Sequence, residues 1–336
     1  MANTLKQIAE KCGVSSMTVS RALRNQGPVK EATREKILAV AKLFGYLQGG
    51  RPGRPATTPD ARPVVEVVLG SVGRRVPAFY LELLTAIEQC LAASGHDCVI
   101  RTCNGEYTQV LALRDALRRS SAIGVMIIGD FQPEPLAALL GVSPPALLVD
   151  HPGDAAAGAD CESINFDNVA AATLAVQHLL SIGRQRIVLI RGPATHYFSR
   201  EIERGYRAAH AAAGVSCRPS LIVEADFTVD GADTALSALI GRGIAFDAVF
   251  TNDEMAVGVY RTLGQHRLGI PGDVAVCGCD GLPIGQQLSP ALTTVFLDYR
   301  EMGRLAVEHL LKIAKTPPRV PCRIRLMPRF EKHDSA

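Results

Sequence analysis

The chain has 336 residues, 47% of them hydrophobic, which is enough to bury more than one core and to form about two or three domains. No run is apolar enough to span a membrane, and the first residues lack a signal peptide's apolar segment, so we expect a cytoplasmic protein without a membrane partner. Residues 1–63 hold eleven Lys and Arg against four Asp and Glu, whereas the remainder is acidic. This asymmetry is typical of a nucleic-acid-binding module attached to an acidic body.

Residues 5–23 predict two short helices joined by a tight turn. Apolar residues at intervals of three and four give the first helix one buried face, made of Leu5, Ile8, Ala9 and Cys12. Gly13 tolerates the left-handed conformation that ends this helix, and Ser15 can cap the next one. The spacing alone fits a helix-turn-helix and an ordinary helical hairpin about equally well.

The second helix, from Met17 to Leu23, turns one face to solvent. Its outward-facing residues are Ser16, Met17, Ser20 and Arg21. The string Ile-Ala-x-x-Cys-Gly-Val-Ser-x-x-Thr-Val-Ser-Arg-Ala-Leu, followed by Thr-Arg-Glu-Lys-Ile from Thr33, closely resembles the headpiece of the LacI/GalR family. The Met-Thr-Val-Ser-Arg form of this helix resembles that of gluconate-type repressors.

The resemblance implies which headpiece residues contact DNA. Ser16 and Met17 stand at base-selecting positions, where Met17 offers apolar contact, for instance to a thymine methyl, and Arg21 can reach guanine O6 and N7. The residues expected to hold phosphates are Thr4, Ser15, Thr18, Ser20, Lys30 and Thr33.

Residues 47–63 contain three glycines and four prolines, so a stable hinge helix is not expected there. Pro55 stands where the family has a leucine that inserts between base pairs. The stretch from Arg51 to Pro55 resembles a minor-groove arm, in which Arg51 and Arg54 would enter an A/T-rich groove. A plain solvated linker fits this segment equally well.

From residue 64, apolar runs alternate with amphipathic segments, which predicts parallel sheets covered by helices on both faces. About nine strands are expected, too many for one small sheet, so two Rossmann-like lobes are the natural division. By resemblance this α/β core is periplasmic-binding-protein-like and follows an all-α helix-turn-helix headpiece. We expect a headpiece over 1–46, a linker over 47–63 and a core over 64–336, with lobe 1 at about 64–163 and 298–320 and lobe 2 at about 164–297 and 321–331.

A ligand cleft is expected between the lobes, because open α/β sheets bind ligands at the carboxyl ends of their strands. The resemblance implies that Asn252 bonds a ligand hydroxyl, that Asp253 caps the following helix and that Asp280 accepts from the ligand. Further positions that match cleft-lining sites are Phe79, Tyr80, Asp150 and Phe227. Strand-to-helix turns and core packing are the alternative explanations for these residues.

The charge of the ligand is predicted from arginines. The family usually has an arginine three residues before the glycine at position 205, but this chain has Ile202 there. Arg200 or Arg204 can substitute, and Arg74 with Arg75 lies in the first loop of lobe 1. Because guanidinium groups bind carboxylates in bidentate fashion, a sugar acid is favoured over a neutral sugar.

No residue set predicts catalysis, since nucleotide-binding, esterase and zinc-protease motifs are all missing from the sequence. We therefore expect no enzyme, no cofactor and no metal, and nine reduced cysteines. The expected function is that of a DNA-binding transcription regulator, a repressor of carbohydrate metabolism, acting as a homodimer on a pseudo-palindromic operator, with a tetramer left open. The alternative is a solute-binding receptor of sugar transport, which the core alone would permit.

Overall fold

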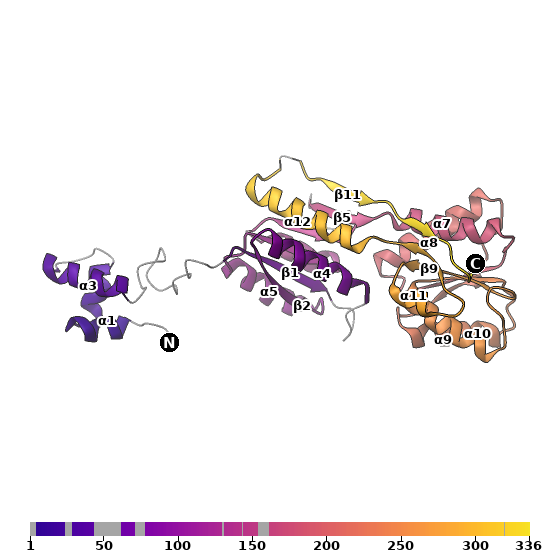
Figure 1. The fold of residues 1–336 in the computed structure, drawn as a ribbon, viewed down its shortest axis with the longest axis horizontal. Coiled ribbons are helices and arrows are strands. Elements are labelled where there is room, and N and C mark those ends of the chain that lie inside the picture. Colours follow the sequence, from indigo (N-terminus) through magenta and orange to yellow (C-terminus); the bar gives the residue numbers. More distant parts are fainter. Residues whose placement is uncertain are drawn as a thin grey trace. The chain divides into compact units, whose positions relative to one another are not determined.

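The computed structural model describes residues 5–23, 29–43, 62–70, 78–129, 131–142, 144–153, 161–318 and 320–336. It divides into two compact units, Met1–Arg62 and Pro63–Ala336 (Figure 1). Four predicted site residues lie outside the described residues: Thr4, Arg51, Arg54 and Arg74. No helix in the described part of the chain is long and apolar enough to cross a membrane.

The first unit is a bundle of three helices, α1 (Leu5–Cys12), α2 (Ser16–Leu23) and α3 (Glu31–Leu43). The turn after α1 has the predicted geometry, because Gly13 has φ of 71° and the backbone NH of Thr18 donates to Ser15 Oγ at 3.1 Å. Apolar residues of all three helices form one small core, made of Ile8, Ala9, Cys12, Val19, Ala22, Ile37 and Ala41.

The second unit begins with a six-stranded parallel sheet in the order β11-β5-β4-β3-β1-β2. Its strands are β1 (Val64–Gly70), β2 (Asp97–Cys103), β3 (Gly124–Ile128), β4 (Ala146–Val149), β5 (Glu162–Phe166) and β11 (Arg323–Leu326). Residues of α4 (Ala78–Ala93) and α12 (Tyr299–Lys315) pack on one face, and residues of α5 (Tyr107–Arg119) and α6 (Pro133–Leu140) pack on the other. This sheet and its helices form the first lobe.

The second lobe is built around another six-stranded sheet, in the order β12-β10-β9-β8-β6-β7. Its strands are β6 (Ile187–Arg191), β7 (Ile222–Glu224), β8 (Ala248–Phe250), β9 (Ala275–Asp280), β10 (Thr293–Phe296) and β12 (Arg329–Glu331). One face carries α7 (Asn168–Ser181) and α8 (Tyr197–Ala212), and the other carries α9 (Val229–Gly241) and α10 (Asp253–Gln265). Two short helices, η1 (Pro219–Leu221) and α11 (Pro283–Gln287), complete the lobe, and β12 is antiparallel to β10.

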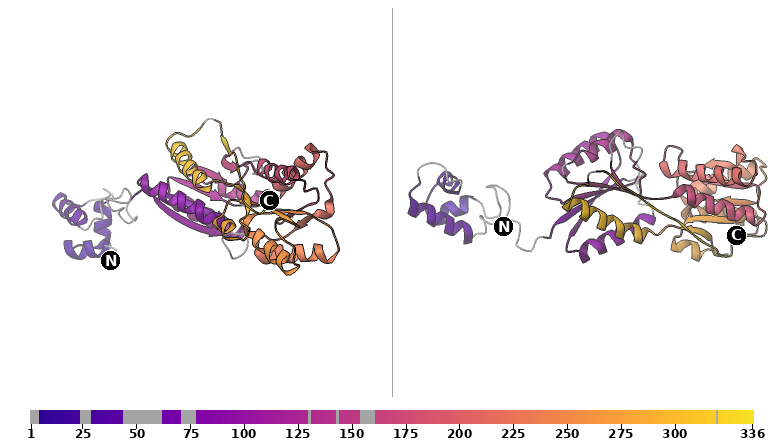
Figure 2. Two further views of the ribbon diagram at one scale, coloured as in Figure 1. Left: turned by 45° about the vertical axis from the view of Figure 1, so that its right-hand side comes forward. Right: turned by 90° about the horizontal axis from the view of Figure 1, so that it is seen from above.

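The chain crosses between the lobes after β5, after β10 and after β11 (Figure 2). The predicted lobe limits were wrong at two of these crossings, because they assigned residues 164–166 and 321–326 to lobe 2. In the structure β5 and β11 pair in parallel with each other, with Arg323 opposite Ser163, and both belong to the first sheet. The strand β11 therefore forms one edge of the first sheet, next to β5.

Candidate functional site

The outer face of α2 carries three chemically distinct side chains. Ser16, Met17 and Arg21 are exposed, with Met17 at 64%, while Val19 and Ala22 of the same helix are buried. Burial of Val19 and Ala22 fixes the rotation of α2, so the predicted base-selecting residues share the free face. This face offers a hydroxyl, an apolar thioether and a guanidinium group to a partner surface.

Polar residues flank that face at the helix ends. Ser15 is exposed at the N-terminus of α2, and its hydroxyl lies 2.9 Å from that of the half-buried Thr18. Lys30 is exposed at the start of α3, where its carbonyl accepts the backbone NH of Thr33 at 2.9 Å. Ser20 and Thr33 are half-buried. Helix N-termini with hydroxyl and ammonium groups are suited to anions such as phosphate.

The second unit contains a cleft between its two lobes, with about 1000 Å³ of space, part of it open to solvent. The described residues that line it are Gly70, Phe79, Tyr80, Asp150, Asn168, His196, Tyr197, Phe198, Asp226, Phe227, Thr228, Asn252, Glu254, Asp280, Leu282 and Tyr299. Six predicted effector residues are among them: Phe79, Tyr80, Asp150, Phe227, Asn252 and Asp280. The cleft brings together residues that are far apart in the chain, from Gly70 to Tyr299.

Three of the predicted residues have left-handed backbone conformations: Asp150 with φ of 55°, Phe227 with φ of 63° and Asp280 with φ of 128°. Such conformations cost free energy for residues other than glycine and cluster at functional sites. Gly192 is required beside Phe227, because a Cβ at this position would lie 2.1 Å from the phenyl ring. The ring therefore packs on bare backbone at the end of β6.

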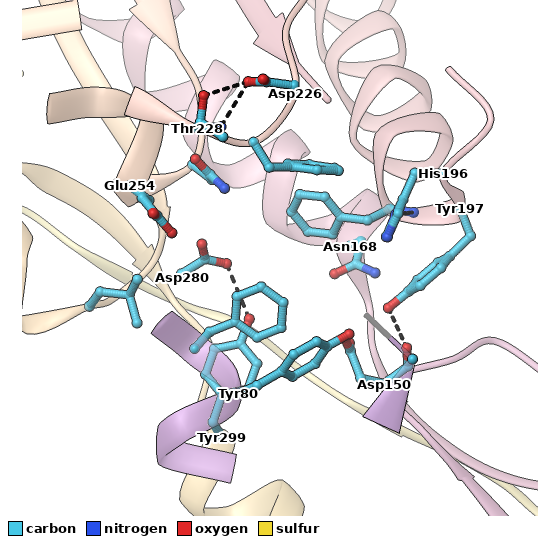
Figure 3. Close-up of a pocket in the computed structure, with 16 residues that line it drawn as sticks. Tyr80, Asp150, Asn168, His196, Tyr197, Asp226, Thr228, Glu254, Asp280 and Tyr299 are labelled. Atoms are coloured by element: carbon cyan, nitrogen blue, oxygen red, sulfur yellow. Dashed lines mark hydrogen bonds between the residues drawn. The ribbon is translucent and has the colours of Figure 1, made fainter. Parts of the chain in front are cut away.

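Two tyrosines bridge the cleft by hydrogen bonds (Figure 3). Tyr197 at the start of α8 donates to the backbone carbonyl of Asp150 at 2.5 Å, which joins lobe 2 to lobe 1. Tyr299 at the start of α12 donates to Asp280 Oδ1 at 3.1 Å, which joins lobe 1 to lobe 2. Within lobe 1, Tyr80 donates to Asp150 Oδ2 at 3.4 Å. The two lobes thus meet through the residues that line the cleft.

Burial dominates the electrostatics of the cleft. It raises the pKa of Asp280 well above its ordinary value, and the nearby carboxylate of Asp253 raises it further. Burial also raises the pKa of Asp253 to about 6, although hydrogen bonds from Thr294 and from the backbone of Leu282 oppose the shift. The pKa of His196 falls to about 4 through burial, so this imidazole is neutral at pH 7.

The structure corrects the predicted roles of two neighbouring residues. Asn252, not Asp253, caps α10, because its Oδ1 accepts the backbone NH of Met255 at 2.9 Å. Asp253 is fully buried within the first turn and accepts from Thr294 Oγ1 and from the backbone NH of Leu282, each at 2.6 Å. Asn252 still lines the cleft, with its amide nitrogen left for a ligand.

The predicted cationic side of the cleft is not found among the described residues. Arg200 is exposed, donates to the backbone carbonyl of Thr195 and does not line the cleft. Arg204 is exposed on α8, and Ile202, where the family has arginine, is 4% exposed. No lysine or arginine is among the described residues that line the cleft.

Sequence reasoning missed several lining residues, chiefly His196, Tyr197, Asn168 and Tyr299. The run His-Tyr-Phe at positions 196–198 was an available signal, because three rings at a helix start after a buried strand are unusual for a surface turn. His196 stacks on Tyr197 with ring centroids 5.2 Å apart and meets Phe227 edge-on at 5.0 Å. Tyr299 gave no such signal, because its place in the cleft depends on a crossing between lobes.

Two family models match the chain. Residues 4–48 match "Bacterial regulatory proteins, lacI family", and residues 176–336 match "Periplasmic binding protein-like domain". The ribose operon repressor of Escherichia coli (strain K12) is 29% identical over 340 residues, covering 99% of each chain. The transcriptional repressor CytR of the same strain is 28% identical, covering 92% of this chain and 89% of CytR.

Solved structures of transcriptional regulators have a similar fold. A complex of the transcriptional regulator CelR with cellobiose has a TM-score of 0.74 at 26% identity and covers 99% of this chain and 100% of the other. The Lac repressor dimer bound to operator and the anti-inducer ONPF has a TM-score of 0.72 at 23% identity, covers 100% of this chain and 99% of its own, and supports the fold. With its helix-turn-helix unit and its two-lobed core, the chain belongs to the LacI family of bacterial DNA-binding transcriptional regulators.

Proposed function

We propose that the protein is a repressor that binds one operator sequence and is controlled by a small molecule held in the interlobe cleft. The observation that carries this proposal is the combination of an exposed face on α2 with an interlobe cleft in a second unit of the same chain. A solute receptor needs only the cleft, and a plain DNA-binding protein needs only the helix face. A regulator uses both.

On DNA, α2 would lie in the major groove with its exposed face against the bases. Arg21 would donate to guanine O6 and N7, Met17 would contact an apolar group such as a thymine methyl, and Ser16 would complete the reading surface. The residues assigned to phosphates are Ser15, Thr18, Ser20, Lys30 and Thr33, with Thr4 as a further prediction from the sequence.

We propose a homodimer on a pseudo-palindromic operator, since a two-fold symmetric protein places two identical headpieces on two half-sites. Because operator DNA is cytoplasmic in bacteria, the protein would act there. Effector binding changes operator affinity only if the effector favours one arrangement of the lobes over another. The tyrosine bridges Tyr197 to Asp150 and Tyr299 to Asp280 give a closed arrangement that an effector could favour or oppose.

The effector is proposed to be a polyhydroxylated, carbohydrate-type molecule without net negative charge. Four carboxylates and two asparagines lie among the described lining residues, and these groups suit a ligand that donates many hydrogen bonds. The sugar-acid prediction now depends on Arg74 and Arg75, which lie outside the described residues, because neither Arg200 nor Arg204 lines the cleft. The relatives named above, a ribose operon repressor and a cellobiose-bound regulator, are also associated with neutral sugars.

The test uses full-length protein and a duplex that it selects from a random pool, with affinity measured by fluorescence anisotropy. Arg21→Ala should weaken binding about 5- to 150-fold, the loss of about 1–3 kcal/mol expected for one bidentate base contact. Arg242→Ala removes the same charge from an exposed site on lobe 2 and should leave affinity unchanged. Equal effects of the two substitutions would contradict the assigned reading face.

The cleft is tested on the same complex by adding pentoses, hexoses, disaccharides and their acid derivatives. A carbohydrate that changes operator affinity should also raise the melting temperature of the protein by mass action. Asn252→Ala should weaken both effects together. A ligand that changes operator affinity equally in wild type and Asn252→Ala would place the effector site outside the cleft.

A further inference from the structure

A small recess lies in lobe 2 beside the cleft. Phe198 and Asn252 line both the recess and the cleft, so the two spaces adjoin at these residues. The recess has room for about one water-sized group. Its residues all fall within 161–318, a range that the structure describes without a gap. Besides Phe198, the side chains that form its apolar walls are Ile190, Ile202, Phe250, Met255 and Cys279.

The apolar walls of the recess belong to the core of lobe 2. Ile190, Phe250, Met255 and Cys279 are at most 1% exposed, and Ile202 is 4% exposed. Burial raises the pKa of the Cys279 thiol well above its ordinary value, and the nearby Asp280 raises it further. The thiol is therefore protonated at pH 7, and a buried protonated cysteine behaves as a small apolar side chain.

Two polar side chains of the walls already form hydrogen bonds within the protein. Thr251 donates from Oγ1 to the backbone carbonyl of Ile190 at 2.9 Å. The guanidinium of Arg191 bonds Glu203 at 2.9 Å and Glu224 at 2.8 Å. A hydroxyl that enters the recess gives up its hydrogen bonds to water, which costs free energy unless the walls replace them. An apolar group has no such cost.

Two residues of this chain leave the recess open. Ile202 stands where the LacI family usually has arginine, whose longer side chain would extend from the same position on α8 into this space. Gly192 at the end of β6 has no side chain, and a Cβ there would collide with the ring of Phe227. The residue at position 202 therefore controls the space that an effector finds beside the cleft.

We propose that the effector carries a methyl group, which occupies this recess, on a polyhydroxylated body that occupies the cleft. The effector class is then a deoxy sugar of the 6-deoxyhexose type. Burial of one methyl group gives a gain in affinity of about fourfold over a hydrogen atom at the same position. This proposal rests on the proposed function, because it assumes that the interlobe cleft is the effector site.

The test compares sugars of equal ring stereochemistry that carry a methyl, a hydroxymethyl or a hydrogen at one carbon. Binding to full-length protein is measured by isothermal titration calorimetry at pH 7. The sets, each beginning with the methyl sugar, are L-fucose, L-galactose and D-arabinose; L-rhamnose, L-mannose and L-lyxose; D-fucose, D-galactose and L-arabinose; and 6-deoxy-D-glucose, D-glucose and D-xylose. In at least one set the methyl sugar should bind about fourfold or more tightly than both others. If no set shows this order, or no methyl sugar binds, the proposal is overturned.

Variants locate the effect. Ile202→Arg fills the recess and should abolish the preference for the methyl sugar, whereas Ile182→Arg adds the same charge at a 40% exposed position after α7 and should keep it. Ile202→Met, which lengthens the side chain without adding charge, replaces Ile202→Arg if that variant melts well below wild type. A methyl preference that survives a folded Ile202 variant overturns the assignment to the recess.

Operator binding measured on the same preparations separates the two hypotheses. Intact operator binding without a preference for the methyl sugar overturns this inference alone. Absent operator binding overturns the proposed function.

Discussion

Asp253 shows how one buried carboxylate links the cleft to the stability of the fold. It lies at the first turn of α10 and holds Thr294 of β10 and the backbone of Leu282 through hydrogen bonds of 2.6 Å. It also faces Asp280, whose pKa is raised in the same direction. The two carboxylates share one buried region, so each ion makes the other more costly.

This arrangement predicts that the protein loses stability as pH rises. Asp253 has a pKa of about 6 in the folded protein against an ordinary value of 3.8, so the folded state binds its proton more tightly than the unfolded state. Its contribution to stability is therefore present below about pH 4 and lost as pH rises through about 6, on the order of 2–3 kcal/mol. Urea unfolding between pH 4 and 7 measures it.

Asp253→Asn should flatten this pH dependence, because an amide does not titrate and can still bond Thr294 and Leu282. Part of the slope should remain, since Asp280 titrates in the same direction. Asp230→Asn, at an exposed position, should leave the slope as in wild type. A wild-type protein whose stability rises from pH 4 to 6 would contradict the assignment.

The starts of α8 and α12 determine how the lobes meet. Each begins with a tyrosine that donates across the cleft, from Tyr197 to the carbonyl of Asp150 and from Tyr299 to the carboxylate of Asp280. Because Tyr197 and Tyr299 are 3% and 6% exposed, the hydrogen bonds are shielded from water. We expect these two helix starts to govern the balance between open and closed lobes.

Tyr197→Phe should lower the free energy of unfolding by about 1 kcal/mol, because it leaves a buried carbonyl without its donor. It should also alter the effector concentration needed to change operator affinity, since the closed arrangement loses one of its bridges. Tyr107→Phe removes a hydroxyl at a 52% exposed site on α5 and should change neither quantity. Identical melting and identical effector response in both variants would exclude a role for the Tyr197 bridge.

The segment around residues 51–55, which lies outside the described residues, gives a prediction from sequence alone. If Arg51 and Arg54 enter the minor groove, Arg51→Ala with Arg54→Ala should weaken operator binding and reduce the slope of log affinity against log salt by about two. Arg218→Ala with Arg242→Ala, at exposed sites of lobe 2, is the charge-matched control. An unchanged salt slope would identify the segment as a tether only.

At the scale of the whole molecule, the observed fold agrees with the sequence-based prediction wherever hydrophobic patterning determines the secondary structure. The buried strands β3, β4 and β8 consist of uninterrupted apolar residues, and β1 departs from this only at Glu66. The strand β12 has no such signal, because its Arg-Phe-Glu sequence is short and polar. The crossings between lobes were misplaced because strand pairing, not hydrophobicity, assigns β5 and β11 to the first sheet.

Part of the cleft could also be predicted from the sequence. Residues at strand ends, such as Asp150 and Asp280, could be located because parallel strands place their carboxyl ends at one edge. Whether Asn252 or Asp253 caps α10 depends on the residue at which the helix begins after β8. The local sequence does not determine that residue. The charge of the cleft was predicted from isolated arginines, and their side-chain directions depend on the tertiary fold.

The decisive experiment is selection of DNA by the full-length protein from a random pool, followed by sequencing, with residues 63–336 as the control lacking the helix-turn-helix unit. We predict one enriched motif made of two inverted half-sites, absent with the control, and Arg21→Ala should lose preference at one base pair in each half-site. If full-length protein enriches no motif beyond that of the control, the protein is not a sequence-specific regulator.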